Sequence, residues 1–140
     1  MEAAFLATTY TVYLPQGALS LRIDEPCAVL KDWLAARKID CFALLTAHNP
    51  DAASCPSDEN AEWQAQLEGE LLEGNYELYA TEHRADAGDW PLEEGCFVPE
   101  LQVEDALALG EAYGQLAVVV GGRDGVPHLR WTELAKKNGA

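Results

Sequence analysis

The chain has 140 residues, of which 49% are hydrophobic, and this length and composition fit one globular domain that needs no metal or disulfide to fold. Its net charge of −15 argues against nucleic acid or an anionic membrane as a direct ligand. No apolar run approaches the ~20 residues of a membrane span. The first residues lack the basic region of a secretory signal, so we expect a cytoplasmic protein.

The N-terminal part of the chain predicts a β-hairpin followed by a helix. Residues 8–14 are rich in β-branched and aromatic side chains, and residues 19–23 alternate between apolar and polar ones. From about residue 26 to 37 the apolar positions have helical spacing, with Asp24 or Glu25 suited to the N-terminal turn. We expect this helix to lie on the hairpin.

The middle of the chain predicts a buried strand and a second helix. Residues 41–45 form a short, unbroken apolar run, which is typical of a central strand covered on both faces. Ser57 is suited to cap a helix that runs to about Glu73 and stops at Gly74.

The remaining elements follow in chain order: a strand at 76–80, a polar loop at 82–92, a strand from 96, a helix from 103 to about 113, and strands at 116–120 and 128–131. We therefore expect one α/β domain of the α+β type over residues 1–132, with a flexible tail at 133–140. Helices between strands favour a mixed, partly parallel sheet with β-hairpins at its edges, packed against about three helices.

The four cysteines are Cys27, Cys41, Cys55 and Cys96, and they are too widely spaced for a zinc motif. Cys27 and Cys41 lie in apolar stretches, where a thiol behaves as a small hydrophobe. We expect these two to be buried and all four to be free thiols.

Residues 51–105 carry 16 acidic side chains and one basic one, Arg84, whereas the rest of the chain holds eight of each sign. Two interpretations remain open. The charge serves solubility, or it forms an acidic face that meets a basic protein partner.

The loop after residue 45 is the best position for a ligand site, because ligands of α/β sheets lie beyond the carboxyl ends of the strands. Asn60 and Gln64 share one helical stripe with apolar residues further along, so both should face inward, near His48 and Asn49. These amides either satisfy buried loop backbone or line a polar pocket.

The sequence contains no clear metal-binding or catalytic motif. His48, His83 and His128 form no metal-binding pattern, and we predict neither a metal nor a cofactor. Cys96 as a nucleophile, or the Glu93-Glu94 pair as acid and base, stays open, and no catalytic residue is assigned.

Four elements carry a family resemblance: Thr46-Ala47-His48-Asn49-Pro50; Ser57 with Glu59-Asn60; Trp90 through Glu94 to Cys96-Phe97-Val98; and Tyr113-Gly114-Gln115 before Ala117-Val118. With them the chain resembles the bacterial DUF3293 family of uncharacterised proteins from about residue 21 to 120. The resemblance implies that Asn49, Asn60, Trp90, Glu94 and Gln115 belong to one constellation, and it implies no activity.

The sequence therefore predicts a binding module that takes a small polar ligand or a protein partner through an amide-lined pocket. The alternatives are a small enzyme that uses Glu94 with Asn49, Asn60 and Gln115, and an inhibitor or immunity-type protein that presents its acidic face. The oligomeric state is left open.

Overall fold

The structure is a computed structural model that describes residues 2–50 and 53–137. Asp51 of the acidic segment and residues 138–140 of the expected tail lie outside the described residues. The helices are α1 (Glu2–Leu6), α2 (Ala28–Ala36), α3 (Ser57–Glu73), α4 (Val103–Ala112) and α5 (Glu133–Lys137). The strands are β1 (Thr8–Leu14), β2 (Gly17–Leu21), β3 (Cys41–Leu45), β4 (Tyr79–Ala85), β5 (Glu93–Pro99), β6 (Ala117–Gly122) and β7 (His128–Trp131).

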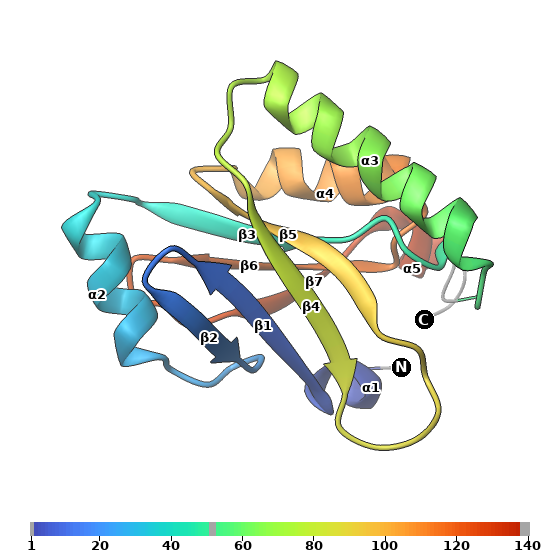
Figure 1. The fold of residues 1–140 in the computed structure, drawn as a ribbon, viewed down its shortest axis with the longest axis horizontal. Coiled ribbons are helices and arrows are strands. Elements are labelled where there is room, and N and C mark those ends of the chain that lie inside the picture. Colours follow the sequence, from blue (N-terminus) through green and yellow to red (C-terminus); the bar gives the residue numbers. More distant parts are fainter. Residues whose placement is uncertain (1, 51–52, 138–140) are drawn as a thin grey trace.

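The strands form one curled sheet in the order β2-β1-β4-β5-β3-β6-β7 (Figure 1). The α+β class and the hairpins agree with the prediction. The expected parallel pairs are not found, because every neighbouring pair of strands in the described residues is antiparallel.

The connections explain this pairing. The segment with α3 joins β3 to β4, and the segment with α4 joins β5 to β6. Each helix thus joins two strands that run in the same direction, but a third strand lies between them: β5 separates β3 from β4, and β3 separates β5 from β6. From β3 to β6 this is the β-α-β-β-α-β arrangement of split βαβ folds, extended by the β1-β2 hairpin at one edge and by β7 at the other.

Helices cover the two faces of the sheet differently. α3 and α4 lie on one face, where Leu67, Leu71 and Ala106 pack on β3, β5 and β6 (Figure 1). α2 covers part of the opposite face with Leu30 and Leu34. α2 does not cover the rest of this second face, and the candidate site lies there.

The helix starts differ from the prediction. Cys27 occupies the N-cap of α2 and Pro56 that of α3, and neither makes a side-chain capping bond. Asp24, Glu25 and Ser57 therefore do not cap these helices, although α3 begins at Ser57 and ends at the expected residue.

Two strands are longer than expected. β4 occupies Tyr79–Ala85 rather than 76–80, and β5 begins at Glu93 rather than at residue 96. Thr81 and His83 point into the protein from β4, so polar residues at buried positions concealed the strand.

The two ends of the described chain are helical. α1 precedes β1 and was not predicted. α5 occupies the first part of the segment that we expected to be a flexible tail, and its Ala135 is fully buried.

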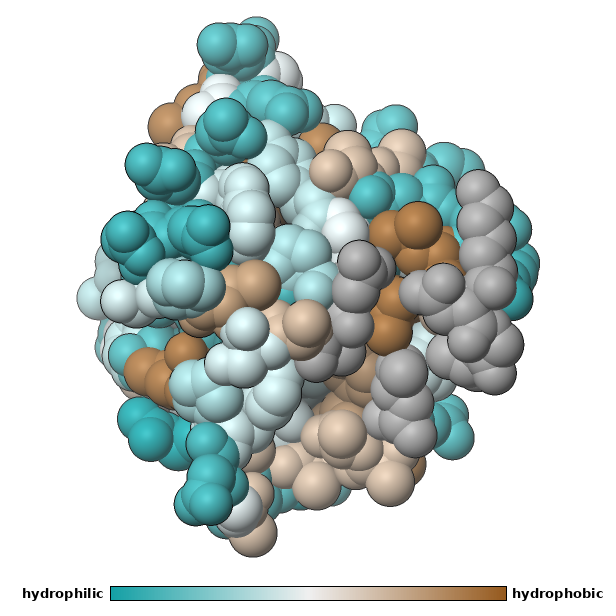
Figure 2. Space-filling view, turned by 90° about the vertical axis from the view of Figure 1, so that its right-hand side faces the viewer, coloured by the Kyte–Doolittle hydropathy of each residue, from teal (hydrophilic) through white to brown (hydrophobic). Residues whose placement is uncertain are grey.

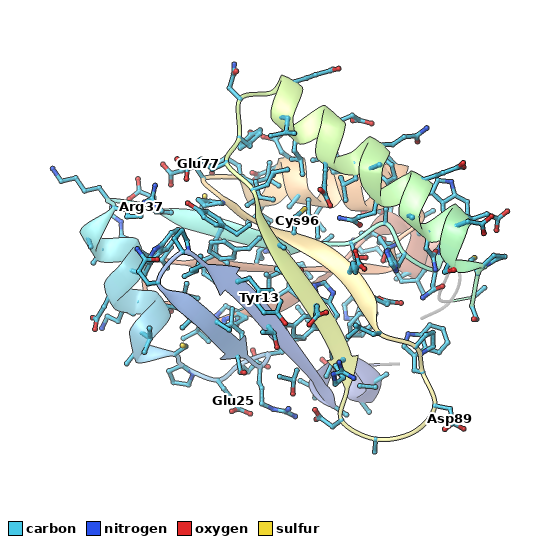
Figure 3. The ribbon with its side chains drawn as sticks, in the orientation of Figure 1. Tyr13, Glu25, Arg37, Glu77, Asp89 and Cys96 are labelled. Carbon is cyan, nitrogen blue, oxygen red and sulfur yellow. The ribbon has the colours of Figure 1, made fainter. Side chains whose placement is uncertain are left out.

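All four cysteines are free thiols, but their burial differs from the prediction. Cys27, Cys41 and Cys55 are half-buried, and Cys96 is the buried one. Cys96 lies on β5 beneath the helix layer, which is formed by α3 and α4 (Figure 3). Its burial raises the pKa of the thiol to about 12, and the nearby Glu68 adds to the shift.

Candidate functional site

Three segments that are distant in the sequence meet where β3 ends. β5 and β6 both run antiparallel to β3, so each begins beside the carboxyl end of β3. Glu93 at the start of β5 and Gln115 just before β6 therefore lie next to the loop with His48 and Asn49. Gln115 Nε2 donates to the carbonyl oxygen of His48 over 3.0 Å, which fixes this junction.

Asn49 holds the turn after β3. Its backbone is left-handed, with φ of 51°, a conformation that asparagine tolerates better than most residues. Asn60 Oδ1 accepts from the backbone N–H of Asn49 at 2.8 Å, and Asn60 Nδ2 donates to Asn49 Oδ1 at 2.9 Å. Asn49 Oδ1 also accepts from the backbone N–H of Cys55. The two asparagines thus organise the loop between β3 and α3.

Gln64 supports the same loop one turn further along α3. Its Oε1 accepts from the backbone N–H of Ala47 at 2.9 Å, and its Nε2 donates to Glu68. Asn60 and Gln64 are both 5% exposed and share the buried stripe of α3 with Leu67 and Leu71, as predicted. Of the two open interpretations, the contacts match the one in which these amides satisfy buried backbone.

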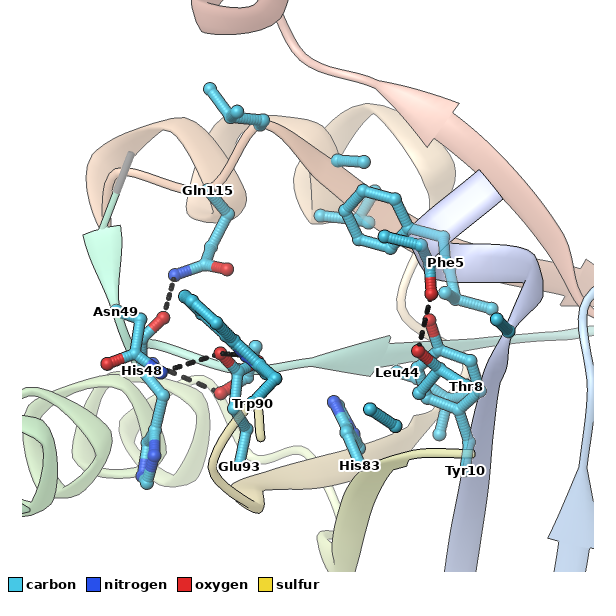
Figure 4. A pocket seen from close by; sticks show the side chains of 18 of the residues that line it. Phe5, Thr8, Tyr10, Leu44, His48, Asn49, His83, Trp90, Glu93 and Gln115 are labelled. Carbon is cyan, nitrogen blue, oxygen red and sulfur yellow. Dashed lines mark hydrogen bonds between the residues drawn. The ribbon is translucent and has the colours of Figure 1, made fainter. Parts of the chain in front are cut away.

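A pocket of about 370 Å³ opens beside this loop, on the face of the sheet that α2 leaves uncovered (Figure 4). Its floor is formed by β1, β3, β4, β5 and β6, and α1 contributes a wall through Ala4 and Phe5. The lining is mainly apolar and includes Leu44, Ala85 and Val119. The polar lining residues are Thr8, Tyr10, Thr46, His48, Asn49, His83, Trp90, Glu93 and Gln115.

Glu93 is the carboxylate of the pocket. Its Oε2 accepts from Asn49 Nδ2 at 2.7 Å and from Trp90 Nε1 at 3.1 Å (Figure 4). Burial raises the pKa of Glu93 above its ordinary value, and these two hydrogen bonds act in the opposite direction. The carboxylate is held in one orientation, close to apolar walls.

Burial shifts the pKa of each of the other titratable side chains of the pocket toward its uncharged form. Burial lowers the pKa of His83 to about 3, with a further lowering by His48, and burial also lowers the pKa of His48. His83 Nε2 lies 2.9 Å from the hydroxyl of Thr81. Burial raises the pKa of Tyr10, and the charge of Glu93 adds to this effect.

The structure places the predicted site residues in two groups. His48, Asn49, Trp90 and Gln115 line the pocket, whereas the side chains of Asn60 and Gln64 lie behind Asn49 and hold the loop. Glu94 is in neither group.

The side chain of Glu94 is exposed on the other face of β5, and its carbonyl oxygen accepts from the Thr46 hydroxyl. Its neighbour Glu93 occupies the expected position instead, because successive residues of a strand point to opposite faces. Glu93 shares its face with Gly95 and Phe97, and Glu94 shares the other face with Cys96 and Val98. Because both faces carry buried residues, the alternation along β5 could not select Glu93 from the sequence.

The described residues 2–50 and 53–137 contain no group of three or more His, Cys, Asp or Glu side chains arranged for a metal ion. In the same residues, no helix combines the length and the apolar character needed to cross a bilayer. On the face shown in Figure 2, hydrophobic residues form several small patches between hydrophilic ones.

Comparison with known proteins gave one match. The sequence model of a family described as "Protein of unknown function (DUF3293)" matches residues 45–118, which span the loop after β3, Glu93 and Gln115. No curated protein and no solved structure matches the chain.

Proposed function

Because this chain belongs to the DUF3293 family, whose description assigns no function, we propose a function from the geometry of the pocket: it binds a small molecule with an apolar body and a polar head. The head faces Glu93, Asn49 and Gln115, and the body lies on the sheet beneath α1. We further propose that the protein works in the cytoplasm, which agrees with its four free thiols.

One observation carries this proposal. The pocket of about 370 Å³ combines apolar walls with a few convergent polar groups at one end, which is the usual composition of a small-molecule site. Such sites typically occupy about 300–1,000 Å³, so the ligand is small. The walls favour a ligand that has an apolar body as well as the polar group expected from the sequence.

Binding is favoured over catalysis by the state of the polar residues. An enzyme built on Glu94 would need that side chain in the pocket, and it is exposed elsewhere. Asn49, Asn60 and Gln64 are committed to backbone and side-chain partners within the protein. Glu93 remains as an oriented carboxylate that serves recognition.

Titration with 2-phenylethanol, followed by protein NMR, tests the proposal. We expect saturable shifts of the Trp90 indole N–H and of residues that line the pocket. The substitution Ala85→Phe should weaken binding by about tenfold or more, because an aromatic ring then occupies the pocket, and tenfold corresponds to only about 1.4 kcal/mol.

Ala80→Phe is the matched control. Ala80 lies on the same strand as Ala85 but is exposed and does not line the pocket. We expect this variant to bind like the original protein. Non-saturable shifts, or equal binding by both variants, would contradict the proposal.

The helix layer supports a second candidate, a basic protein partner. α3 and α4 carry nine acidic residues and no basic one. A groove between them is lined by Leu71, Leu101 and Leu109 with Glu70 and Asp105 at its sides. Cross-linking in cells, followed by loss of the same product in a Glu70→Lys, Asp105→Lys variant, tests this candidate.

A further inference from the structure

Three side-chain donors at the polar end of the pocket are already engaged. Asn49 Nδ2 and Trp90 Nε1 both donate to Glu93 Oε2. Gln115 Nε2 donates to the carbonyl oxygens of His48, at 3.0 Å, and Tyr113, at 3.3 Å. A ligand that accepts hydrogen bonds from these three groups therefore has to displace contacts within the protein.

Two acceptor oxygens at this end are free. Within the described residues, Glu93 Oε1 and Gln115 Oε1 have no hydrogen-bond partner, and neither is sealed away from solvent. The engaged Nε2 group fixes the orientation of the Gln115 amide, so that its oxygen faces the open part of the pocket (Figure 4). Two fixed acceptors select a head group that donates hydrogen bonds.

Charge narrows the choice of head group. Among the described residues, Glu93 is the only acidic residue in the lining, and no lysine or arginine accompanies it there. An anionic head would face this carboxylate without a counter-ion, whereas a cationic head supplies the missing one. The net charge of −15 attracts cations toward the molecule as a whole.

The aromatic side chains fit the same class. Phe5, Tyr10 and Trp90 line the pocket, and the indole of Trp90 lies beside the Glu93 carboxylate. Aromatic faces attract organic cations and pack on apolar bodies. Carboxylate, free acceptors and aromatic rings together are suited to one kind of ligand.

We propose that the ligand of this pocket is a small organic amine in its protonated form, with the ammonium group paired to Glu93 Oε1 and its hydrogen bonding completed by Gln115 Oε1. This inference rests on the proposed function and adds the chemical class of the ligand. The amine carries an aromatic or aliphatic body that fills the apolar part of the pocket.

A series of three probes of similar shape tests it by NMR titration: 2-phenylethylamine, 2-phenylethanol and 3-phenylpropionate. We expect the amine to bind about tenfold more tightly than the alcohol or better, and the carboxylate to bind most weakly, because charge-assisted hydrogen bonds are the stronger ones. The unmodified protein suffices for this comparison, so the test does not depend on the folding of any variant.

Glu93→Gln and Glu94→Gln form the matched pair of variants. Both remove one negative charge from adjacent residues, but only Glu93 lines the pocket. We expect Glu93→Gln to abolish the preference for the amine over the alcohol and Glu94→Gln to keep it. Equal losses in the two variants would show general attraction to an acidic protein and overturn the inference.

The possible failures are distinguishable. If alcohol and amine bind the pocket equally, the amine class is wrong and the proposed function stands. If no probe binds, the proposed function fails, and this inference fails with it. Nα-acetyl-lysine methylamide, which imitates a lysine within a protein, is a fourth probe. If it binds more weakly than 2-phenylethylamine, the ligand is a free small amine. If it binds more tightly, the amine belongs to a lysine of a protein.

Discussion

α3 carries two glutamines, one buried and one exposed. Gln64 is buried and accepts from the backbone N–H of Ala47, whose own exposed area is zero. Gln66 lies two positions further along the same helix and is exposed. The difference comes from the helical period, which turns one residue toward the sheet and the other toward solvent.

We expect Gln64→Ala to lower the free energy of unfolding by about 1–3 kcal/mol, since it leaves the buried N–H of Ala47 without an acceptor. Gln66→Ala makes the same change of helix propensity at an exposed position, and we expect an effect within about 0.5 kcal/mol. Urea denaturation measures both. Equal effects would mean that the loop does not depend on this hydrogen bond.

Three neighbouring strands place titratable side chains in one row across the sheet. Tyr10 of β1 pairs with His83 of β4, and His83 pairs with Glu93 of β5. Residues that face each other across antiparallel strands point to the same face, so all three line the pocket. The tyrosine and histidine rings meet at a centroid distance of 4.8 Å.

The row makes stability depend on pH. His83 titrates near 6.5 when unfolded and near pH 3 when folded, so the unfolded chain binds more protons between these values. Its contribution to stability is complete above about pH 6.5 and is lost as the pH falls, by at most about 1.4 kcal/mol per pH unit. The raised pKa of Glu93 has the opposite sign and offsets part of this loss as the pH falls toward the ordinary pKa of a glutamate.

We expect the unfolding free energy of the original protein to fall between pH 7 and 5.5, and to fall less steeply in a His83→Gln variant. His128→Gln provides the control, because His128 is exposed. Chemical denaturation at several pH values gives the slopes. A His83→Gln slope as steep as that of the control would show that His83 is not held neutral.

Local patterns predicted the elements with a clear apolar pattern. α3 occurs where its helical stripe predicted it, and β3 occurs where an unbroken apolar run predicted it. β4 was misplaced because Thr81 and His83 occupy its buried positions and resemble loop residues. The loop amides were recognised by their stripe, but the choice between Glu93 and Glu94 depended on which face of β5 points to the pocket.

Local sequence patterns could not predict which strands pair with each other. Helical connections correctly indicated that β3 and β4 share a direction, yet nothing near either strand shows that β5 lies between them. The contribution of α1 to the pocket was hidden for the same reason. Phe5 packs edge-on against Trp131 of β7, which is close to the other end of the chain.

Charge is unevenly distributed over the whole molecule. The nine acidic residues of α3 and α4 form no ion pair within the described residues, whereas the ion pairs involve residues outside these two helices. Tyr113 donates to Glu70, which is a hydrogen bond without charge compensation. Repulsion across this helix layer therefore opposes folding at low ionic strength.

We expect the melting temperature to rise when sodium chloride is increased from about 10 mM to about 150 mM, because the screening length falls from about 30 Å to about 8 Å. Most of the rise in melting temperature should be complete by about 1 M sodium chloride, where the screening length is about 3 Å. A Glu70→Gln, Asp105→Asn variant should start from a higher melting temperature and respond less to salt. A salt response unchanged by these substitutions would place the repulsion elsewhere.

The strand order also governs how the chain reaches its native state. The β1-β2 hairpin joins neighbouring segments, but β1 must find β4, and β3 must find β5 and β6, across long stretches of chain. Closing such loops costs entropy before any contact repays it, so topologies of this kind fold more slowly than helical bundles. Because all of these strands except β2 supply the floor of the pocket, the pocket is completed only when the last of them has docked.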